Sequence, residues 1–389
     1  MAGASIYLDN AATSFPKPAG VYDALRRYYL ESGAAVGRGA YRQAVEVQAE
    51  VDRCRQWAAR LFNAESPQRI VFTFNGTDSL NLAIHGVLRS GEHVITSAIE
   101  HNSVVRPLRE LERDRRIELS LIAADAAGVV NPDDFRQALR PETRLIVLTQ
   151  ASNVSGAIQP CREVGRIARE AGVLFLIDAA QSAGHLPIDV QSLSADLLAC
   201  PGHKGLLGPL GTGLLYIRPG LEKSLRSLRQ GGTGTRSEEE YQPESMPDKY
   251  EAGNHNAPGL IGLSAALRWR LDQDPAALRT REHSLLERLL TGLKTIQEVE
   301  IHGPPSAAGR VGVVSISLTG QDPQIVAMLL DQVAGVQVRS GLHCAPGAHR
   351  AWGTFERGGT VRLSPGPFTT TDEIDRTVEA LRQIAESLL

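Results

Sequence analysis

The sequence predicts an α/β fold built on a mostly parallel, seven-stranded sheet flanked by helices, followed by a smaller α/β domain. Three observations predict it. Short runs of strand-forming residues alternate with helical segments through the first half of the chain, a pattern typical of parallel strands joined by crossover helices. The pattern changes after about residue 260. At 389 residues, the chain also exceeds the usual size of one domain.

The strands predicted for the large sheet are short apolar runs, as buried parallel strands are. The last follows its predecessor through a glycine-rich link, so we expect it to be antiparallel. The seven predicted strands are Ile70–Phe74, His93–Ser97, Leu119–Ala123, Leu145–Thr149, Val173–Asp178, Leu197–Cys200 and Gly213–Ile217. The helices predicted before and between them are Lys17–Glu31, Arg42–Phe62, Ser79–Leu88, Ser103–Arg113, Pro132–Leu139 and Arg162–Ala171.

A long segment without periodicity, Gln230–Asn256, separates this region from the rest. Loops of that length are usually functional or disordered. We expect a large domain over residues 16–264 and a small domain formed by residues 1–15 and 265–389. The later predicted helices are Gly259–Asp272, Leu278–Glu298, Gln324–Val333 and Thr371–Leu388, and the later strands are Val311–Leu318, Val336–Ser340 and Thr360–Ser364.

The amino-acid composition and the charge exclude several classes of protein. Hydrophobic residues make up 42% of the chain, and the formal net charge is −3 with no long basic run, so no nucleic-acid or membrane-surface binding is expected. No apolar stretch approaches the ~20 residues of a membrane span. The N-terminus does not resemble a signal peptide. Four scattered cysteines without a CxxC pair favour a reducing, cytoplasmic setting.

Two polar residues follow neighbouring predicted strands and suggest a cofactor. Asp178 ends one strand, and Lys204 lies just beyond the next. In α/β sheets, ligands bind at the carboxyl ends of strands. A lysine that forms a Schiff base and an acid beside the pyridinium nitrogen together hold pyridoxal 5'-phosphate (PLP). An Asp–Lys pair at this separation is common, so further residues have to support this interpretation.

Other strand ends carry polar groups that suit a phosphorylated aromatic cofactor. Gly76 and Thr77 begin a helix, where backbone amides bind anions. His101, Asn153 and Gln181 follow three other strands. Each residue also fits an ordinary structural role, such as helix capping. Together with the lysine turn, however, five strand ends carry such groups, and their joint presence favours the cofactor.

A second candidate centre is the loop around Cys344. Arg339 and His343 are close to it in sequence, and such neighbours can lower a thiol pKa and create a nucleophile. Arg362, in a later predicted strand, can clamp a carboxylate, although a surface arginine is the simpler interpretation.

The other cysteines are expected to be small buried hydrophobes: Cys54, Cys161 and Cys200. A metal site made of Cys200, His203, His343 and Cys344 lacks the short paired-ligand spacing typical of zinc. We therefore expect no metal.

Eight motifs occur in an order that resembles a known family: IYLDNAATSFPKP, GT (Gly76–Thr77), EHNS, SNVSG, DAAQSAGHLPIDV, GHKGLLGPLGTG, RSGLHCAP and GTVRLSPGPFTT. From about Ile6 to the C-terminus, the chain resembles the class V aminotransferase group. It is most similar to the cysteine desulfurases, in the branch that also contains selenocysteine lyases. The resemblance implies the fold type I of PLP-dependent transferases. The compact RSGLHCAP loop resembles the short cysteine loop of the second desulfurase subgroup.

The resemblance implies a role for each candidate. Lys204 would bind the cofactor covalently, His101 would stack on its ring, and Cys344 would accept sulfur. The remaining cofactor contacts would come from Gly76, Thr77, Asn153, Asp178, Gln181 and His203. The substrate contacts would come from Asn153, Arg339, His343 and Arg362.

The resemblance also implies a homodimer with shared active sites. The EAGNHN turn would then reach the cofactor phosphate of the neighbouring subunit. Two residues depart from the family pattern. Pro201 stands where relatives carry a Ser or Thr that binds phosphate, and Asn254 stands where a Thr is usual. We hypothesise that Asn254 or His255 supplies the lost contact.

The expected activity is conversion of L-cysteine to L-alanine, with transfer of sulfur to Cys344 as a persulfide and then to an acceptor, which can be a protein. Three alternatives remain open at this stage: a selenocysteine lyase acting on L-selenocysteine, another PLP lyase or epimerase of the family, and a non-catalytic sulfur carrier that has kept the fold.

Overall fold

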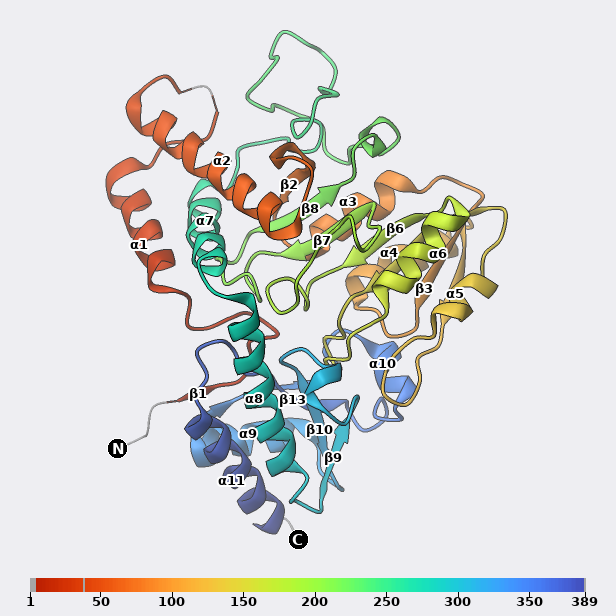
Figure 1. Ribbon diagram of the computed structural model, residues 1–389, viewed down its shortest axis with the longest axis vertical. Coiled ribbons are helices and arrows are strands. Elements are labelled where there is room, and N and C mark those ends of the chain that lie inside the picture. Colours follow the sequence, from red (N-terminus) through yellow and green to blue (C-terminus); the bar gives the residue numbers. More distant parts are fainter. Residues whose placement is uncertain (1–4, 38, 388–389) are drawn as a thin grey trace.

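The computed structural model describes residues 5–37 and 39–387. Its centre is a seven-stranded sheet in the order β2-β8-β7-β6-β5-β3-β4 (Figure 1). β8 is antiparallel to both neighbours and the other strands are parallel, as predicted. The strands are β2 (Ile70–Thr73), β3 (Glu92–Ser97), β4 (Ile117–Ile122), β5 (Thr143–Thr149), β6 (Leu174–Asp178), β7 (Leu197–Pro201) and β8 (Gly213–Ile217).

Both faces of this sheet are buried because successive side chains of a strand point to opposite sides. In β5, Leu145 and Val147 belong to the hydrophobic core that contains residues of α3 and α4. Ile146 and Leu148 belong to the core that contains residues of α2 and α6. The helices of this part are α1 (Ala19–Arg27), α2 (Arg42–Phe62), α3 (Gly76–Val87), α4 (Asn102–Arg113), α5 (Pro132–Gln137), α6 (Cys161–Ala171) and α7 (Ala257–Leu271).

A four-stranded antiparallel sheet, β12-β13-β10-β9, forms the lower part of the molecule (Figure 1). It shares one hydrophobic core with α8, α9 and α11. The elements here are α8 (Pro275–Leu293), β9 (Val299–His302), β10 (Val314–Leu318), α9 (Pro323–Ala334), β11 (Val336–Gln337), β12 (Arg339–Gly341), α10 (Pro346–Ala351), β13 (Thr360–Leu363) and α11 (Thr371–Ser387).

Several predicted boundaries are wrong. The helix predicted over Leu278–Glu298 ends at Leu293, and β9 follows it. The strand predicted over Val336–Ser340 is two strands, because the chain changes partner from β1 to β13. The first helix ends at Arg27 and continues as a wider π-helical turn. The predicted end of the last helix, at Leu388, lies outside the described residues.

The N-terminal segment connects the two sheets. β1 (Ile6–Tyr7) pairs in parallel with β11, beside the small sheet. A few residues later, the backbone N–H and the hydroxyl of Ser14 both donate to the carbonyl of His203, beyond the end of β7. This segment therefore belongs to both parts of the molecule.

Residues 230–256 contain no helix or strand, in agreement with the predicted loop. They form the extended loop at the top of Figure 1. Within the described part of the chain, no helix has the combined length and apolarity that a membrane span needs.

Candidate active site

A cavity of about 120 Å³ lies at the carboxyl ends of the parallel strands. Because those ends meet along one edge of the sheet, residues far apart in sequence come together there. Eight of the residues predicted for the cofactor line this cavity: Gly76, Thr77, His101, Asn153, Asp178, Gln181, His203 and Lys204.

Asp178 is the last residue of β6 and is only 2% exposed. One of its carboxylate oxygens, Oδ1, accepts a hydrogen bond from the backbone N–H of Ala180 at 2.8 Å. Burial raises the pKa of Asp178, while the Ala180 hydrogen bond and the Lys204 ammonium oppose that shift. A buried carboxylate with an oxygen to spare is suited to a positively charged ring nitrogen.

Lys204 follows β7 in a tight turn. Burial lowers its pKa to about 8, and the guanidiniums of Arg362 and Arg339 contribute to this shift, which Asp178 opposes. A lysine with a lowered pKa has a larger fraction of neutral amine at neutral pH, and the neutral amine is the form that reacts with carbonyl carbons and accepts protons.

His101 caps the N-terminus of α4. Its Nδ1 accepts a hydrogen bond from the backbone N–H of Ser103 at 3.0 Å, so in the neutral imidazole the proton lies on Nε2. Burial, followed by the charge of Lys204, lowers the pKa of His101 to about 4. The ring is therefore neutral at pH 7, and it lines the cavity. The Ser103 hydroxyl also forms a hydrogen bond with the Thr77 hydroxyl, at 2.7 Å.

The part of the cavity at the start of α3 is suited to an anion. The N-terminus of α3 opens onto it at Gly76 and Thr77, with Asn75 as the cap. A side chain at Gly76 would lie 3.0 Å from the Pro201 ring, so only glycine leaves this approach open. Nδ1 of His203 is buried and has no partner among the described residues. An acid, a lysine, a neutral imidazole and a helix N-terminus around one cavity are a donor set that fits PLP.

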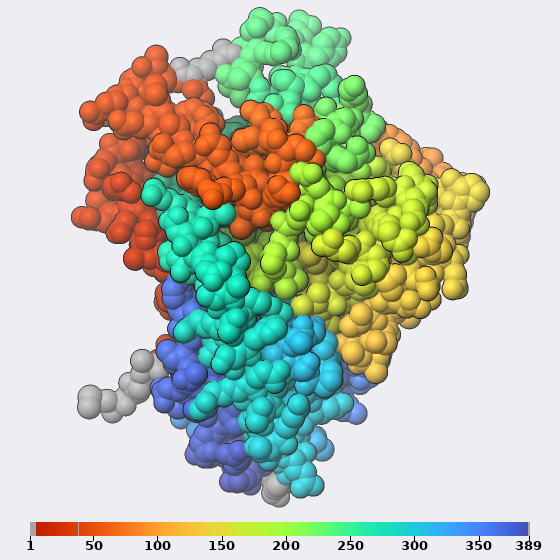
Figure 2. Space-filling view, viewed as in Figure 1, coloured from red at the N-terminus to blue at the C-terminus, as the bar shows by residue number. Residues whose placement is uncertain are grey.

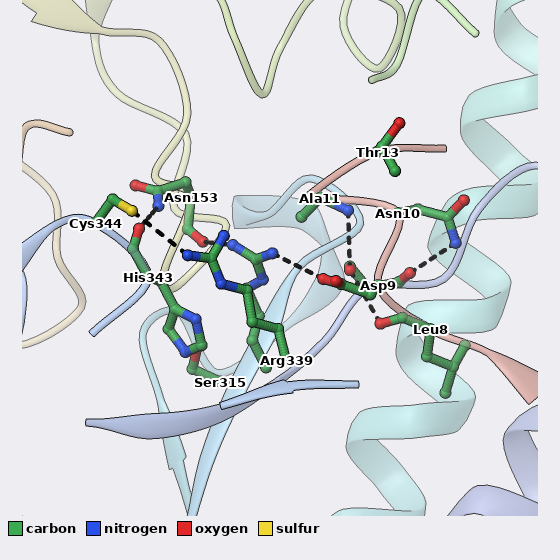
Figure 3. A network of polar contacts seen from close by, with 12 residues as sticks. Leu8, Asp9, Asn10, Ala11, Thr13, Asn153, Ser315, Arg339, His343 and Cys344 are labelled. Carbon is green, nitrogen blue, oxygen red and sulfur yellow. Dashed lines mark hydrogen bonds and ion pairs between the residues drawn. The ribbon is translucent and has the colours of Figure 1, made fainter. Parts of the chain in front are cut away.

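The cysteine loop lies beside this cavity and is tied to it by Asn153 (Figure 3). Asn153 Nδ2 donates to the carbonyl of His343 at 2.5 Å, and Arg339 Nη2 donates to Cys344 Sγ at 3.4 Å. His343 and Cys344 have φ values of 47° and 58°. Two consecutive non-glycine residues in the left-handed region cost about 1–3 kcal/mol each and persist where the surroundings hold them.

Arg362 lies in β13, directly opposite Arg339 in β12. It is 1% exposed, and its Nη2 donates to Oδ1 of Asp9 at 2.9 Å, while Nη1 donates to the carbonyl of Asn153. Its Nε is buried without a partner among the described residues. In Figure 3, Asp9 and Asn153 lie on opposite sides of the Arg339 side chain. Arg362 is therefore a buried residue and not a surface arginine. Its Nε–H group has no acceptor among the described residues.

Two predicted residues lie elsewhere in the single chain. Asn254 and His255 line a separate small cavity with Phe72 and Arg229, and His255 Nε2 lies 3.2 Å from Glu251. The remaining three cysteines are buried free thiols, as predicted: Cys54, Cys161 and Cys200. Among the described residues, no group of three or more His, Cys, Asp or Glu side chains is arranged to hold a metal ion.

Sequence analysis missed Asp9, Ser103 and Glu100 as contributors to this site. Asp9 and Ser103 lie inside the quoted motifs IYLDNAATSFPKP and EHNS, which was the available signal. Glu100 is fully buried and holds the end of β5 by accepting the Thr149 backbone N–H at 3.0 Å. Glu100 is also the first residue of EHNS, but the motif alone does not show its contact with β5.

Comparison with known proteins agrees with this geometry. Residues 6–377 match the family model described as class-V aminotransferase. The chain belongs to the class-V aminotransferase family. A probable cysteine desulfurase of Methanothermobacter thermautotrophicus is 38% identical over 384 residues, which cover 98% of this chain and 94% of that protein.

Solved structures of the class-V family are also similar. The apo cysteine desulfurase of Thermococcus onnurineus has a TM-score of 0.92 at 33% identity, covering 98% of this chain and 95% of the other. The cysteine desulfurase CsdA of Escherichia coli, in an S-sulfonic acid form, has a TM-score of 0.88 at 29% identity, covering 99% and 96%. The predicted family and the predicted fold, type I of PLP-dependent transferases, are confirmed.

Proposed function

We propose that this protein is a PLP-dependent cysteine desulfurase that releases L-alanine from L-cysteine and carries the sulfur as a persulfide on Cys344. The observation that carries the proposal is the link between the two centres: Asn153 lines the cofactor cavity and also holds the cysteine loop through the carbonyl of His343. The proposal is also supported by relatives named cysteine desulfurase or probable cysteine desulfurase, which are 30–38% identical to this chain.

The cofactor would be held by residues with separate tasks. Lys204 would bind it covalently, Asp178 would keep its ring nitrogen protonated, and His101 would stack on the ring, with Gln181 and Asn153 beside it. Gly76, Thr77 and His203 would hold the phosphate. When bound, PLP stores the electron pair left by breaking the Cα–H bond of an amino acid. Lys204, with a pKa of about 8, is suited to accept that proton and to return it.

The substrate carboxylate would bind at the paired arginines, Arg362 and Arg339, with the free Nε of Arg362 available to it. This places the substrate sulfur towards Cys344. The thiolate attacks that sulfur, the C–S bond breaks and an S–S bond forms, and the former Cβ gains a proton to become the alanine methyl group. Both sulfur atoms are formally oxidised by one electron, and the carbon is reduced by two, so the step needs no other oxidant.

Arg339 supports this role because its Nη2 donates a hydrogen bond to Cys344 Sγ at 3.4 Å, which holds the sulfur beside a cationic side chain. The alternative activity on L-selenocysteine uses the same residues. It depends less on Cys344, because selenolate is the better leaving group. A different PLP lyase or epimerase would not need Cys344 at all.

Alanine production by the purified protein tests the proposal. Wild type supplied with PLP and L-cysteine should form alanine and a protein-bound persulfide. Cys344→Ala should keep the visible absorbance of bound PLP but lose alanine formation from L-cysteine, whereas Lys204→Ala should lose both. Ser340→Ala, in β12 just before the cysteine loop, is the matched control and should remain active. Normal desulfuration by Cys344→Ala would show that the nucleophile is misassigned, and a faster reaction with L-selenocysteine that survives Cys344→Ala would favour the lyase.

We also propose a homodimer in a reducing, cytoplasmic setting, where Cys344 stays a thiol, with a protein acceptor as one destination of the sulfur. In the dimer, Asn254 or His255 would reach the partner's phosphate and replace the hydroxyl lost at Pro201. Light scattering tests the dimer. Asn254→Ala should lower the PLP content of purified protein, with Glu238→Ala, at an exposed position of the same 230–256 segment, as control. Full retention of PLP by Asn254→Ala and by His255→Ala would refute the replacement.

A further inference from the structure

A second cavity, of about 310 Å³, lies away from the cysteine loop. It is bounded by the C-terminal end of α2, the turn after β6, the junction of α7 with α8, and residues 365–367. Figure 2 shows α7 and α8, in teal, on the face turned towards the viewer. Lys204 lines both cavities, so the second one lies against the turn that carries the active-site lysine. Its volume is within the range of small-molecule sites.

The walls of this cavity are largely apolar. The apolar side chains that line it include Leu61, Phe62, Ile188, Leu207, Leu278 and Leu285. Burial of apolar ligand surface against such walls is favourable because it removes that surface from water. A ligand with an apolar body is therefore favoured over a small inorganic ion.

Two arginines that line the cavity have no side-chain partner among the described residues: Arg60, which is exposed, and Arg270, which is partly buried. Arg270, in the last turn of α7, lines the cavity, and its guanidinium makes no hydrogen bond or ion pair within the described part of the chain. Two other arginines that line the cavity already have hydrogen-bond acceptors. Arg279 donates to Glu282 and to the carbonyl of Arg310. Arg281 donates to the carbonyls of Pro367 and Thr369.

The acid nearest to Arg270, Glu282, already has hydrogen-bond partners of its own. Glu282 accepts hydrogen bonds from Gly312 N–H and Arg279, and His185 Nδ1 lies 2.7 Å from its Oε1. Burial lowers the pKa of Arg270 to about 10, and Glu282 offsets this only in part. An anion in the cavity would supply the counter-charge that the fold does not.

A glycine makes room for this guanidinium. Gly184 has φ of +88°, and a side chain built on it would lie 2.9 Å from Nη2 of Arg270. The arginine thus packs over a position without a side chain, and it also lines the cavity.

We propose that this second cavity binds a small amphipathic carboxylate, with its carboxylate on Arg270 and its apolar body against the leucine and phenylalanine side chains. The bound molecule would contact Gly205 and the Lys204 turn from the side opposite to the cysteine loop. The inference depends on the cavity and Arg270 alone, and does not require the proposed reaction.

Calorimetric titration of the PLP-loaded protein with octanoate tests this site. We expect one octanoate per chain with a Kd below about 1 mM, and no saturation by acetate, which has no apolar body. Arg270→Gln should weaken octanoate binding at least ~10-fold, because a charge-assisted, two-point contact is lost. Arg268→Gln is the matched control: it lies on the same helix, but its side chain is 73% exposed and faces Asp272, so binding should be unchanged.

A second variant tests the site independently, in case Arg270→Gln does not fold. Leu278→Trp fills the cavity without altering its charge and should also weaken octanoate, with the thermal unfolding midpoint of each variant measured beside it. The proposal is overturned if wild type does not bind octanoate, if Arg270→Gln binds as wild type does, or if many octanoates bind per chain, as in non-specific association.

Discussion

Replacement of Asp9 by alanine is predicted to destabilise the fold and to weaken substrate binding at the same time. Arg362 is 1% exposed, and the carboxylate that faces its guanidinium is that of Asp9, at 2.9 Å. Burial lowers the pKa of Arg362, and Asp9 opposes this shift. Removing one member of a buried ion pair costs ~3–5 kcal/mol. Asp9 is 23% exposed, and Arg362 would keep the Asn153 carbonyl, so we expect ~2–3 kcal/mol.

Two measurements on Asp9→Ala separate the effects. Urea denaturation should show a lower midpoint with an unchanged slope, and steady-state kinetics should show a raised KM for L-cysteine with a smaller change in kcat, because Arg362 would no longer be held for the carboxylate. Asp375→Ala removes the acid of an exposed ion pair with Arg288 and should leave the urea midpoint unchanged. If Asp9→Ala unfolds at the same urea concentration as Asp375→Ala, then Asp9 does not stabilise Arg362 and the reasoning fails.

Two further buried carboxyls give predictions with opposite dependence on pH. Burial raises the pKa of Glu100 to about 8; a folded-state pKa above the unfolded value means that stability falls as pH rises from about 4.5 to about 8. Glu100→Gln should therefore gain stability relative to wild type across that range, measured as urea midpoints, and parallel curves would contradict this. Burial alone would raise the pKa of Glu251, but Arg55 and His255 lower it to about 2. Its contribution is present above about 4.5 and lost as pH falls towards 2. Glu251→Gln should cost ~3 kcal/mol at pH 7, and this difference should narrow below pH 4.5 and be small near pH 2. An undiminished difference at pH 2.5 would refute the assignment.

The large sheet could be predicted because each of its strands can be recognised from its own short stretch of sequence. Each strand is a short apolar run, and both faces are buried, so the pattern does not depend on which neighbour it meets. The position of Asp178 and Lys204 at strand ends followed from the same pattern. The family motifs supplied what the pattern could not, namely the roles of His101 and Cys344.

Other features depend on contacts that no local pattern records. Asp9 meets Arg362 across 353 positions of sequence. β9, with the half-exposed sequence VEIH, has no strong strand signal and forms because it pairs with β10. The strand predicted over Val336–Ser340 divides because its two halves have different partners. Sequence reasoning fails at such places because partner choice is a property of the whole fold.

The pairing of β1 with β11 has a consequence for synthesis of the chain. Ile6 pairs with Val336, so about 330 residues are made between the two partners. At the usual rates of translation this takes roughly 20–70 s. During that time Ile6 and Leu8, which are fully buried in the folded protein, have no permanent place to pack. The segment that contains Ile6 and Leu8 therefore cannot finish packing until residue 336 has been made.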